Sequence, residues 1–579
     1  MKKQAVKHQP VSNDAFVLDE KTLVFRIRTA KDDIKEVLFC YGDTAYQGNP
    51  VKIDQVKMVK VASDLLFDYY EIVLSDIYER VVYYFSLNDG LNIYYYYADF
   101  FHTEVSLERN DLYKLPYHRK EDVIDIPSWL EEAIVYNIFP DSFIDHKRAQ
   151  TKENVLIVDG KKVKNKLGGT IKEIINHLDY IEDLGANVVY INPIFMGGEY
   201  HKYDTIDYFR IDPHFGSKES FKQLVDECHN RNMKVIIDGV FNHSGWYFFA
   251  FDDVVKHQQD SQYVDWFYCL DFPVYRPEEL EEQPPYACFG YERKMPKLNT
   301  SNPEVINYLM EVNRFWIEEF DIDGWRLDVA DEVDDNFWRV FKKVAKYHKK
   351  DIAIIGEVWQ SAERYLDNSM FDSTMNYDFL KYTKAFFAKD EIDAERFDAR
   401  ITHLRLRYRT PFTYAQLNML DSHDVPRFLS HCREDIQRFK LAVVFQLTFL
   451  GVPSIFYGDE QGLSGIKESE YRRPMEFDKN NELKMFYRQL IQLRKQESAL
   501  VKGHYQTVYA KENQGLYIFD RCDQNIVIRV LLNNQQKDIA VSYDQGEILM
   551  SSSPNQQAIE PYGFKIIKMG NNGGDLPCL

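Results

Sequence analysis

Short apolar segments alternate with helix-like segments from about residue 131 to residue 460. Eight of the apolar segments predict strands, which in chain order are AIVYNIF, NVVYINP, KVIID, DGWRLD, IAIIGE, STMNY, AQLNMLD and PSIFYG. Strand–helix alternation of this kind predicts a parallel sheet. Eight such units close a sheet into a TIM (β/α)8 barrel, so we expect an α/β fold built around this barrel.

The segments on either side of the predicted barrel contain predicted strands without intervening helices. Residues 1–125 contain aromatic and β-branched runs such as TLVFRIRTA and RVVYYFSL, which predict an all-β N-terminal sandwich. Residues 501–579 contain HYQTVYA and NIVIRVLLN, which predict a C-terminal β-sandwich that ends in a flexible tail. We assign residues 126–500 to the barrel. An aromatic, proline-bearing subdomain is inserted at about 244–299, after the third strand.

Composition excludes several kinds of partner. The 91 acidic residues outnumber the 71 basic ones, and a net charge of -20 repels a phosphate backbone, so we expect no nucleic acid. The sequence has neither a basic block for anionic lipid nor an apolar run that could span a bilayer, so we expect no membrane. Seven cysteines without C-x-x-C pairs, and a start that lacks the apolar part of a secretory signal, predict a cytoplasmic protein.

Acidic residues stand at the ends of several predicted barrel strands. Asp238 ends KVIID, Asp328 ends DGWRLD and Glu357 ends IAIIGE, while His423 and Asp424 follow AQLNMLD. In a TIM barrel the carboxyl ends of the strands form the active-site face, so we expect these side chains to converge. A purely structural ion-pair network is a weaker explanation, because the desolvation of buried charges makes such networks poor stabilisers.

A pair of carboxylates beside an arginine is the chemistry of glycoside hydrolysis. One carboxyl protonates the leaving oxygen while the other attacks or activates water. Arg326 lies two residues before Asp328, so both point to the same face of a strand, and its charge favours the ionised form of that carboxylate. Glu357 follows a wholly apolar strand, which suits a proton donor.

The alternative chemistry is a barrel metal site. His201, His243 and His423 together with Asp238 supply ligand types that metals use. Barrel metallohydrolases of the amidohydrolase kind, however, carry their histidines in a motif such as H-x-H at a strand end, and this sequence has none. We therefore expect no metal site among these residues.

The sequence resembles the α-amylase family of glycoside hydrolases, and within it the branch of cyclomaltodextrinases, neopullulanases and maltogenic amylases. The motifs that carry the resemblance are DGVFNH (238–243), GWRLDVADEV (324–333), GEVW (356–359), LDSHDVPRF (420–428), MPKLN (295–299), GVPSIFYGDE (451–460), HKYDTIDY (201–208) and IDPHFGSKESF (211–221). The resemblance covers nearly all of the chain. MPKLN typifies the named branch.

The resemblance implies a role for each matching residue. Asp328 matches the nucleophile, Glu357 the general acid and Asp424 the third carboxylate, which grips sugar hydroxyls. The remaining expected substrate-binding residues are Tyr203, His243, Arg326, Glu332, His423, Glu468 and Arg472. The family retains anomeric configuration, so the two carboxyls should lie about 5–5.5 Å apart. In this branch the N-terminal domain usually mediates a homodimer.

Three departures from the family pattern matter. Asp331 replaces the asparagine of VANEV, which adds a negative charge near the acceptor side. The loop FPDSFIDHKRA, with Thr170 in place of an aspartate, lacks several oxygen ligands of the calcium loop, so we expect that site to be weak or missing. Glu468 replaces an aspartate of DPDCRRPM, while Arg472 is kept.

The sequence thus predicts a retaining hydrolase of α-1,4-glucosidic bonds that acts on cyclodextrins, maltodextrins, starch fragments and pullulan, with transglycosylation and without an organic cofactor. An α-glucosidase or α-1,6-glucosidase of the same family is the alternative, and MPKLN argues against it. An alternative of another class is a catalytically inactive sugar-binding protein. The presence of all three carboxylates disfavours it.

Overall fold

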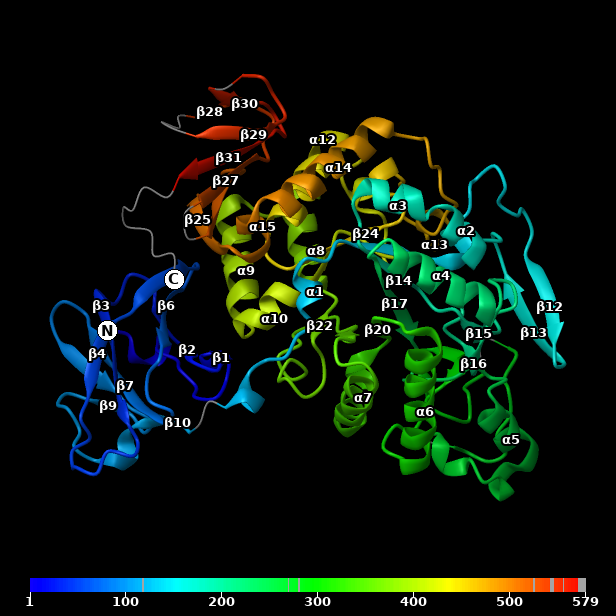
Figure 1. The fold of residues 1–579 in the computed structure, drawn as a ribbon, viewed down its shortest axis with the longest axis horizontal. Coiled ribbons are helices and arrows are strands. Elements are labelled where there is room, and N and C mark those ends of the chain that lie inside the picture. The colour runs from blue at the N-terminus through cyan, green and yellow to red at the C-terminus, as the bar shows by residue number, and fades with distance from the viewer. Residues whose placement is uncertain are drawn as a thin grey trace.

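The computed structural model describes residues 1–116, 119–268, 270–279, 282–523, 526–541, 546–555 and 557–570. Figure 1 shows three parts: an N-terminal β domain, a barrel surrounded by helices, and a C-terminal β-sheet that lies on the same side of the barrel as the N-terminal domain. The tail that the sequence predicts after residue 570 falls outside the described residues.

The barrel forms from the eight predicted segments. Its strands are β11 (Val135–Ile138), β14 (Val188–Ile191), β17 (Lys234–Gly239), β20 (Gly324–Leu327), β21 (Ala353–Gly356), β22 (Ser373–Thr374), β23 (Leu417–Met419) and β24 (Val452–Phe456). They pair in the order β22-β21-β20-β17-β14-β11-β24-β23 and all named pairs are parallel. A parallel bridge between Met375 and Leu417 joins the two ends of the sheet. The predicted TIM barrel is confirmed.

Two apolar layers hold the barrel. Side chains such as Val188, Ile236 and Ile355 pack together inside it. A larger core lies between the strands and the surrounding helices. These helices are α2 (Ile171–Asn176), α3 (Leu178–Leu184), α4 (Lys218–Asn230), α6 (Pro303–Phe320), α7 (Asp335–His348), α8 (Tyr377–Thr383), α9 (Ala394–Leu406), α12 (Ile436–Thr448) and α14 (Asn481–Gln496).

Local sequence signals set the limits of these helices. Helix α6 starts with Pro303 at its first position, and the Asn302 side chain accepts from the Glu304 N–H. Helix α7 starts after Asp334, whose carboxylate accepts two N–H groups of the first turn. Both arrangements satisfy N–H groups that an α-helix leaves without partners at its start.

Three insertions rise above the barrel, two of which the sequence reading missed. The expected subdomain after β17 contains α5 (Phe249–His257), β18 (Cys288–Phe289) and β19 (Glu292–Pro296). The unexpected hairpins are β12 (Asn154–Val158) with β13 (Lys161–Asn165), and β15 (Phe195–Gly197) with β16 (Thr205–Ile211). Asp159 and Gly160 form the first turn with positive φ at both positions, and this Asp-Gly pair was a readable hairpin signal.

The N-terminal part is the predicted sandwich. One sheet has the order β1-β2-β6-β5, and the other has the order β4-β3-β7-β8-β9 with β10 paired to β7. Phe25, Phe39 and Tyr83 lie in the core between the sheets. The strands are β1 (Ala15–Asp19), β2 (Thr22–Ala30), β3 (Glu36–Asp43), β4 (Asp54–Lys57), β5 (Val59–Ser63), β6 (Phe67–Ser75), β7 (Val81–Asn88), β8 (Ile93–Tyr96), β9 (Phe101–His102) and β10 (Tyr113–Leu115).

The C-terminal part shares an apolar core with the barrel helices. Its main sheet has the order β25-β26-β27-β31-β29, and Tyr517 and Phe519 belong to the same buried cluster as the outer barrel core. The strands are β25 (His504–Ala510), β26 (Leu516–Asp523), β27 (Ile526–Asn533), β28 (Ile539–Ala540), β29 (Glu547–Ser551), β30 (Ala558–Ile559) and β31 (Phe564–Gly570).

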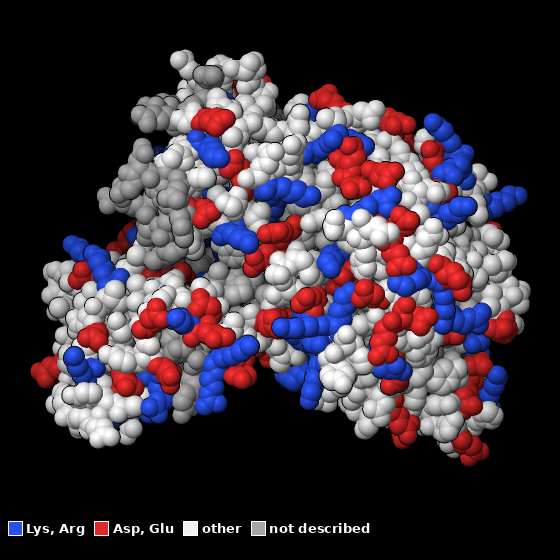
Figure 2. Space-filling model, in the orientation of Figure 1, with Lys and Arg blue, Asp and Glu red and all other residues white. Residues whose placement is uncertain are grey.

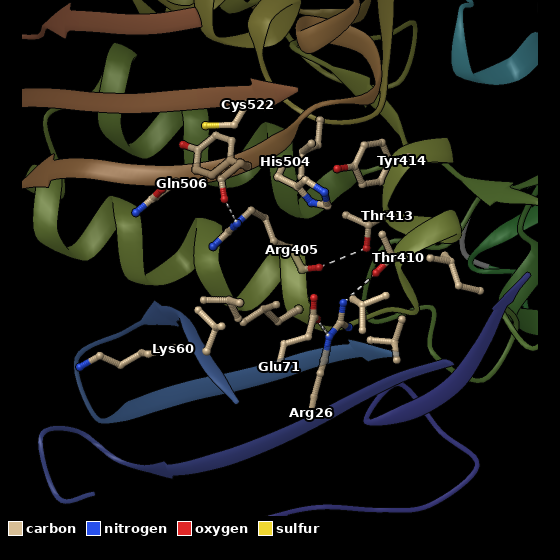
Figure 3. Close-up of a pocket in the computed structure, with 18 residues that line it drawn as sticks. Arg26, Lys60, Glu71, Arg405, Thr410, Thr413, Tyr414, His504, Gln506 and Cys522 are labelled. Carbon is tan, nitrogen blue, oxygen red and sulfur yellow. Dashed lines mark hydrogen bonds and ion pairs between the residues drawn. The ribbon is translucent and has the colours of Figure 1, made fainter. Parts of the chain in front are cut away.

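Polar contacts join the N-terminal domain to the barrel. The Arg26 guanidinium donates to the Tyr408 carbonyl oxygen at 3.1 Å and to Thr410 Oγ1 at 2.7 Å. Beside it lies a cavity of about 360 Å³ whose walls come from all three parts (Figure 3). Its polar groups are largely paired within the protein, as Glu71 is with Arg26 and Tyr414 is with the Gly503 carbonyl.

Candidate active site

The predicted acidic residues lie at the carboxyl ends of neighbouring strands. Asp238 pairs with Arg326 in the β17–β20 register, and Leu327 pairs with Gly356 in the β20–β21 register. Asp328 and Glu357 are therefore the first residues after their strands, at the same end of the barrel. His423 and Asp424 lie in the loop after β23, which ends earlier than the sequence suggested, at Met419.

Arg326 is the centre of the group. Its Nη1 lies 2.9 Å from Asp238 Oδ1 and 2.8 Å from Asp328 Oδ1. Its Nη2 lies 2.9 Å from Glu357 Oε2 and 3.7 Å from Asp424 Oδ2. The guanidinium is fully buried. The structure thus brings all three expected catalytic carboxyls, and Asp238, around one cation.

Asp238 accepts hydrogen bonds from several side chains that surround the site. Its Oδ2 accepts from the hydroxyls of Tyr190 at 2.9 Å and Tyr203 at 3.0 Å, and from Asn192 Nδ2 at 3.2 Å. The Tyr203 hydroxyl also bonds to His423 Nε2, and the two rings stack with centroids 5.6 Å apart. Asp238 therefore fixes the positions of Arg326 and of the rings that line the site.

The Glu357 carboxyl is bonded at both oxygens. Oε2 accepts from the Val329 N–H at 2.8 Å, and Oε1 accepts from Trp359 Nε1 and from the Tyr377 hydroxyl, each at 3.1 Å. Val329 has φ 45° and ψ 48°, a left-handed conformation that is rare for a β-branched residue. This strained backbone directs the N–H of the residue after Asp328 at the neighbouring carboxyl.

Asp424 and His423 join the group from the loop after β23. Asp424 Oδ2 lies 3.1 Å from His423 Nε2, and Arg472 Nη2 lies 3.5 Å from Asp424 Oδ1. Arg472 also donates from Nε to the His423 carbonyl oxygen at 2.7 Å. Arg472 thereby fixes the loop that carries both residues.

Burial and crowding control protonation in the site. Burial, followed by the charge of Glu357, raises the pKa of Asp328 well above its usual range, although Arg326 acts in the opposite direction. Arg326 favours the ionised form of Asp328, as the sequence suggested, but burial and the charge of Glu357 outweigh it. The same two causes raise the pKa of Asp424 to about 7. The charged forms of Asp328 and Asp424 are therefore disfavoured, although Arg326 acts in the opposite direction at both and Arg472 does so at Asp424.

The histidines are neutral. Burial lowers the pKa of His243 to about 3 and that of His201 to about 4, and it lowers the pKa of His423 well below its usual range. His243 stacks on Phe289 with ring centroids 5.2 Å apart, and its Nε2 has no partner among the described residues. A buried, neutral imidazole with a free ring nitrogen suits hydrogen bonding to a sugar hydroxyl.

The comparisons with known proteins agree with this geometry. The family description "Alpha amylase, catalytic domain" matches residues 137–482, and "Alpha amylase, N-terminal ig-like domain" matches residues 1–119. This chain belongs to the α-amylase family of glycoside hydrolases. A cyclomaltodextrinase of Geobacillus thermopakistaniensis (strain MAS1) is 37% identical over 97% of this chain and 99% of its own length.

Two further relatives support the same branch of the α-amylase family. Neopullulanase 2 of Thermoactinomyces vulgaris is 39% identical over 92% of this chain and 91% of its own length. A solved structure of a cyclomaltodextrinase superposes with a TM-score of 0.89 at 36% identity, and the match covers 98% of this chain and 100% of that one.

Two predicted substrate-binding residues of this α-amylase-family chain lie at the rim. Glu468 is half exposed and accepts from Arg472 Nη1 at 3.2 Å and from the Tyr200 hydroxyl. Glu332 is also half exposed and pairs with Lys297 Nζ at 2.9 Å. Neither residue has an ion pair with Arg326, and both pair with other cations instead.

In the loop that carries calcium in many α-amylase relatives, the oxygen atoms form hydrogen bonds with the protein itself. The buried Asp141 carboxylate accepts the N–H groups of Lys166 and Leu167, both at 3.0 Å. Arg148 Nη1 donates to Glu173 Oε1 at 2.8 Å, and Thr170 Oγ1 accepts from the N–H of Glu173 as the cap of α2. These oxygens already have protein donors.

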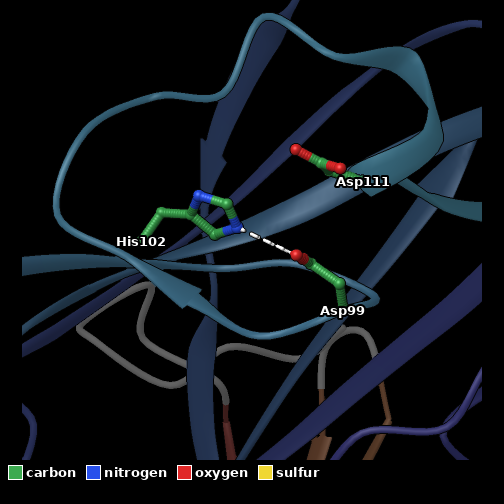
Figure 4. A group of neighbouring side chains, drawn as sticks. All are labelled: Asp99, His102 and Asp111. Carbon is green, nitrogen blue, oxygen red and sulfur yellow. Dashed lines mark hydrogen bonds and ion pairs between the residues drawn. The ribbon is translucent and has the colours of Figure 1, made fainter.

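A metal-like group lies elsewhere, in the N-terminal domain. In the part of the chain that the structure describes, Asp99, His102 and Asp111 are the single set of three or more such ligands whose atoms lie within 4.8 Å of one another (Figure 4). His102 Nε2 lies 3.2 Å from Asp99 Oδ1, and Asp99 is exposed. An ordinary surface ion pair accounts for this contact. The three active-site histidines form no such group among the described residues.

Several residues of the site were not found by sequence reasoning. Asn192 and Tyr190 bind Asp238, and Trp359 and Tyr377 bind Glu357. Lys297 bridges Asn242 Oδ1 at 2.6 Å and Glu332. Tyr190 and Asn192 follow the pattern of polar residues at a strand end, which could have identified them. The contact between Tyr377 and Glu357 joins different barrel units and leaves no sequence signal.

Proposed function

We propose that this protein is a retaining α-glucan hydrolase that cleaves α-1,4-glucosidic bonds of cyclodextrins, maltooligosaccharides and pullulan. One observation carries the proposal: Arg326 holds Asp328 at 2.8 Å through Nη1 and Glu357 at 2.9 Å through Nη2. The two terminal nitrogens of a guanidinium are fixed relative to each other. The carboxyls are therefore held close together, as a double displacement requires.

In the first step, Asp328 attacks the anomeric carbon and forms a covalent glycosyl–enzyme bond. Glu357 gives its proton to the glycosidic oxygen, which leaves with the electron pair of the broken C–O bond as an alcohol. In the second step, Glu357 takes a proton from water, whose oxygen attacks the anomeric carbon and releases Asp328. Two inversions give net retention of the anomeric configuration.

The surrounding groups bind the sugar whose bond is cleaved. Asp424, His243 and His423 supply acceptors and donors for its hydroxyls, and Tyr203 supplies a ring on the same side as His423. The fixed negative charge of the carboxyl group stabilises an oxocarbenium-like transition state. Arg326 keeps this charge in position, and Glu468 and Arg472 contact sugars farther along the chain.

A sugar can replace water in the second step, which gives transglycosylation. Glu332 and Asp331 lie on the acceptor side of Glu357, because the chain from Val329 to Glu332 passes directly beside that carboxyl. Lys297 neutralises Glu332. In the part of the chain that the structure describes, Asp331 has no ion pair, so the acceptor side would carry net negative charge.

We propose that the enzyme needs neither an organic cofactor nor calcium. The oxygens of the family's calcium loop are hydrogen-bonded to the chain, as the contacts of Asp141 with Lys166 and Leu167 illustrate. Asp328 and Glu357 provide the nucleophile and the acid without a metal ion.

We further propose a cytoplasmic homodimer that forms through the N-terminal domain. Exposed apolar side chains gather in one stretch of this domain, namely Leu91, Ile93, Phe100, Val105 and Leu107. Such side chains mark an interaction surface when they are clustered. Four of the five described cysteines are buried, which suits a reducing compartment.

Nucleic acid and membrane partners are disfavoured. On the face shown in Figure 2, basic and acidic side chains are interspersed over the barrel without a continuous basic area. None of the helices in the described part of the chain combines the length and the apolar character of a membrane-crossing helix.

Product analysis tests the proposal. Purified protein is incubated separately with β-cyclodextrin, maltotriose, pullulan and soluble starch, and products are separated by chromatography, with Asp328→Asn as the control. Faster loss of cyclodextrin and maltotriose than of starch supports the proposal. Cleavage restricted to α-1,6 bonds or to terminal glucose supports the α-glucosidase or α-1,6-glucosidase alternative. Binding without cleavage supports the inactive sugar-binding alternative.

A further inference from the structure

The four partners of the Glu357 carboxyl differ in what they can do with a proton. At Oε2 the Val329 N–H donates a hydrogen bond at 2.8 Å, and Arg326 Nη2 lies at the ion-pair distance of 2.9 Å without forming a hydrogen bond. At Oε1 they are Trp359 Nε1 and the Tyr377 hydroxyl, each at 3.1 Å. A backbone N–H, a guanidinium and an indole N–H are donors only. A tyrosine hydroxyl both donates and accepts.

A general acid must hold a proton before bond cleavage and lose it afterwards. A proton on Oε2 would face two groups that cannot accept it. A proton on Oε1 faces Trp359, which cannot accept it, and Tyr377, whose O–H can turn away and offer a lone pair. Among the partners that the structure describes, Tyr377 alone can accept from a proton on Oε1 and also donate to Oε1 once that proton has left.

The surroundings of Tyr377 hold its ring while the hydroxyl can rotate. The residue is the first of α8, is 5% exposed, and stacks on Trp359 with ring centroids 4.1 Å apart at 13°. Burial, followed by the charge of Glu357, raises the pKa of Tyr377 well above its usual range, so it stays an O–H group. Trp359 is half exposed, so its indole can be displaced by a sugar on the acceptor side.

We propose that Tyr377 is a positioning residue that places the catalytic proton of Glu357 on Oε1. Before cleavage its hydroxyl oxygen accepts a hydrogen bond from the Oε1–H group. After the proton has moved to the glycosidic oxygen, the hydroxyl donates to the Oε1 atom of the carboxylate. No atom of Tyr377 is transferred, and the electron pair of the broken C–O bond stays on the leaving oxygen. The proposal rests on the proposed function, because it presumes that Glu357 is the general acid.

The test uses a series of aryl α-maltosides whose phenols differ in acidity. An acidic phenol leaves without help from a general acid, whereas a weakly acidic phenol needs a proton. The rate kcat is measured for the parent, Tyr377→Phe and Trp359→Phe, under conditions where bond cleavage limits the rate. We expect Tyr377→Phe to lower kcat by about tenfold for the least acidic phenols, the equivalent of one neutral hydrogen bond, and to leave the most acidic ones nearly unchanged.

Trp359→Phe is the matched control. It removes a donor from the same oxygen and keeps the stacked ring and the Tyr377 hydroxyl. We expect it to change KM and to leave the dependence of kcat on phenol acidity as in the parent. Circular dichroism and the melting temperature establish that both variants are folded, and Tyr377→Trp provides a second variant if the phenylalanine one unfolds.

Two results would overturn the proposal. The first is an equal loss of kcat for all phenols in Tyr377→Phe, which would mean that the ring only supports the site. The second is that Tyr377→Phe and Trp359→Phe change the dependence of kcat on the acidity of the phenol to the same extent. Failure of the proposed function is distinguishable, because the parent enzyme would then cleave none of the maltosides and Asp328→Asn would behave like the parent.

Discussion

Arg326 Nη1 lies 2.8 Å from Asp328 Oδ1, and both side chains are buried at the mouth of the barrel. The same guanidinium contacts Asp238 and Glu357. Among the described residues it is the one cation in ion-pair contact with these three carboxyls, and its removal would leave buried carboxyls without a cationic partner.

Arg326→Leu should destabilise the protein by about 3–5 kcal/mol, the cost of breaking a buried ion pair from one side. The measurement is urea unfolding followed by fluorescence. Arg314→Leu on the exposed face of α6 is the matched control, because its ion pairs with Glu311 and Glu318 are exposed to solvent and should contribute little to stability. Equal losses in the two variants would contradict the central role of Arg326.

Asp328→Asn should abolish turnover and stabilise the fold. The rate should fall by about 10⁴–10⁶-fold, as follows removal of a covalent nucleophile. Burial and Glu357 disfavour the charge of Asp328, so a neutral amide removes repulsion. Activity assays and differential scanning calorimetry provide the two measurements. A lower melting temperature than that of the parent would show that the buried charge is not a source of strain.

Stability should decrease as pH rises toward neutrality. The pKa of Asp424 is raised to about 7 in the folded protein, whereas an unfolded aspartate titrates near 3.9. Between these two pH values the folded state binds more protons than the unfolded state. The free energy of unfolding therefore falls as pH rises, by about 1.4 kcal/mol per pH unit for a difference of one bound proton. Asp424 is partly open to solvent, so the effect should fall short of this slope.

The variant Asp424→Asn should have a shallower dependence of stability on pH between about 4 and 7. Asp204, whose pKa burial also raises to about 7, should keep part of the slope in the variant. Urea unfolding at several pH values measures both curves. Parallel curves for variant and parent would contradict a raised pKa at Asp424.

Removal of divalent cations should change neither activity nor melting temperature. The Asp141 carboxylate accepts hydrogen bonds from backbone N–H groups, and Arg148 is paired with Glu173. The oxygens of these side chains are thus engaged within the protein, whereas calcium needs several oxygen ligands. The enzyme is assayed after dialysis against a chelator, with a magnesium-supplemented sample as the control. A loss that calcium alone restores would refute this prediction.

Asp331→Asn should increase transfer to sugar acceptors relative to hydrolysis. The asparagine offers an N–H donor to a sugar hydroxyl and removes a negative charge, and one added hydrogen bond of about 1 kcal/mol changes the product ratio by roughly fivefold. Chromatography of products formed with added glucose measures the ratio. Asp331→Glu, which retains the charge, should behave like the parent. An unchanged ratio of transfer to hydrolysis in Asp331→Asn would mean that Asp331 does not contact the acceptor.

The order of apolar strands and helices determined the barrel. Each predicted segment became a strand, because the apolar runs can be buried only between the interior and the helix layer. The placement of Asp238, Asp328 and Glu357 at strand ends also determined that they meet, because parallel strands share one carboxyl edge.

Only the tertiary structure decided how the acids are partnered. Tyr377 reaches Glu357 from the next barrel unit, and Lys297 reaches Glu332 from the inserted subdomain. These contacts depend on closure of the barrel and on loop conformation, neither of which has a local sequence signal. The raised pKa of Asp328 follows in the same way, since burial and the proximity of Glu357 exist only in the folded chain.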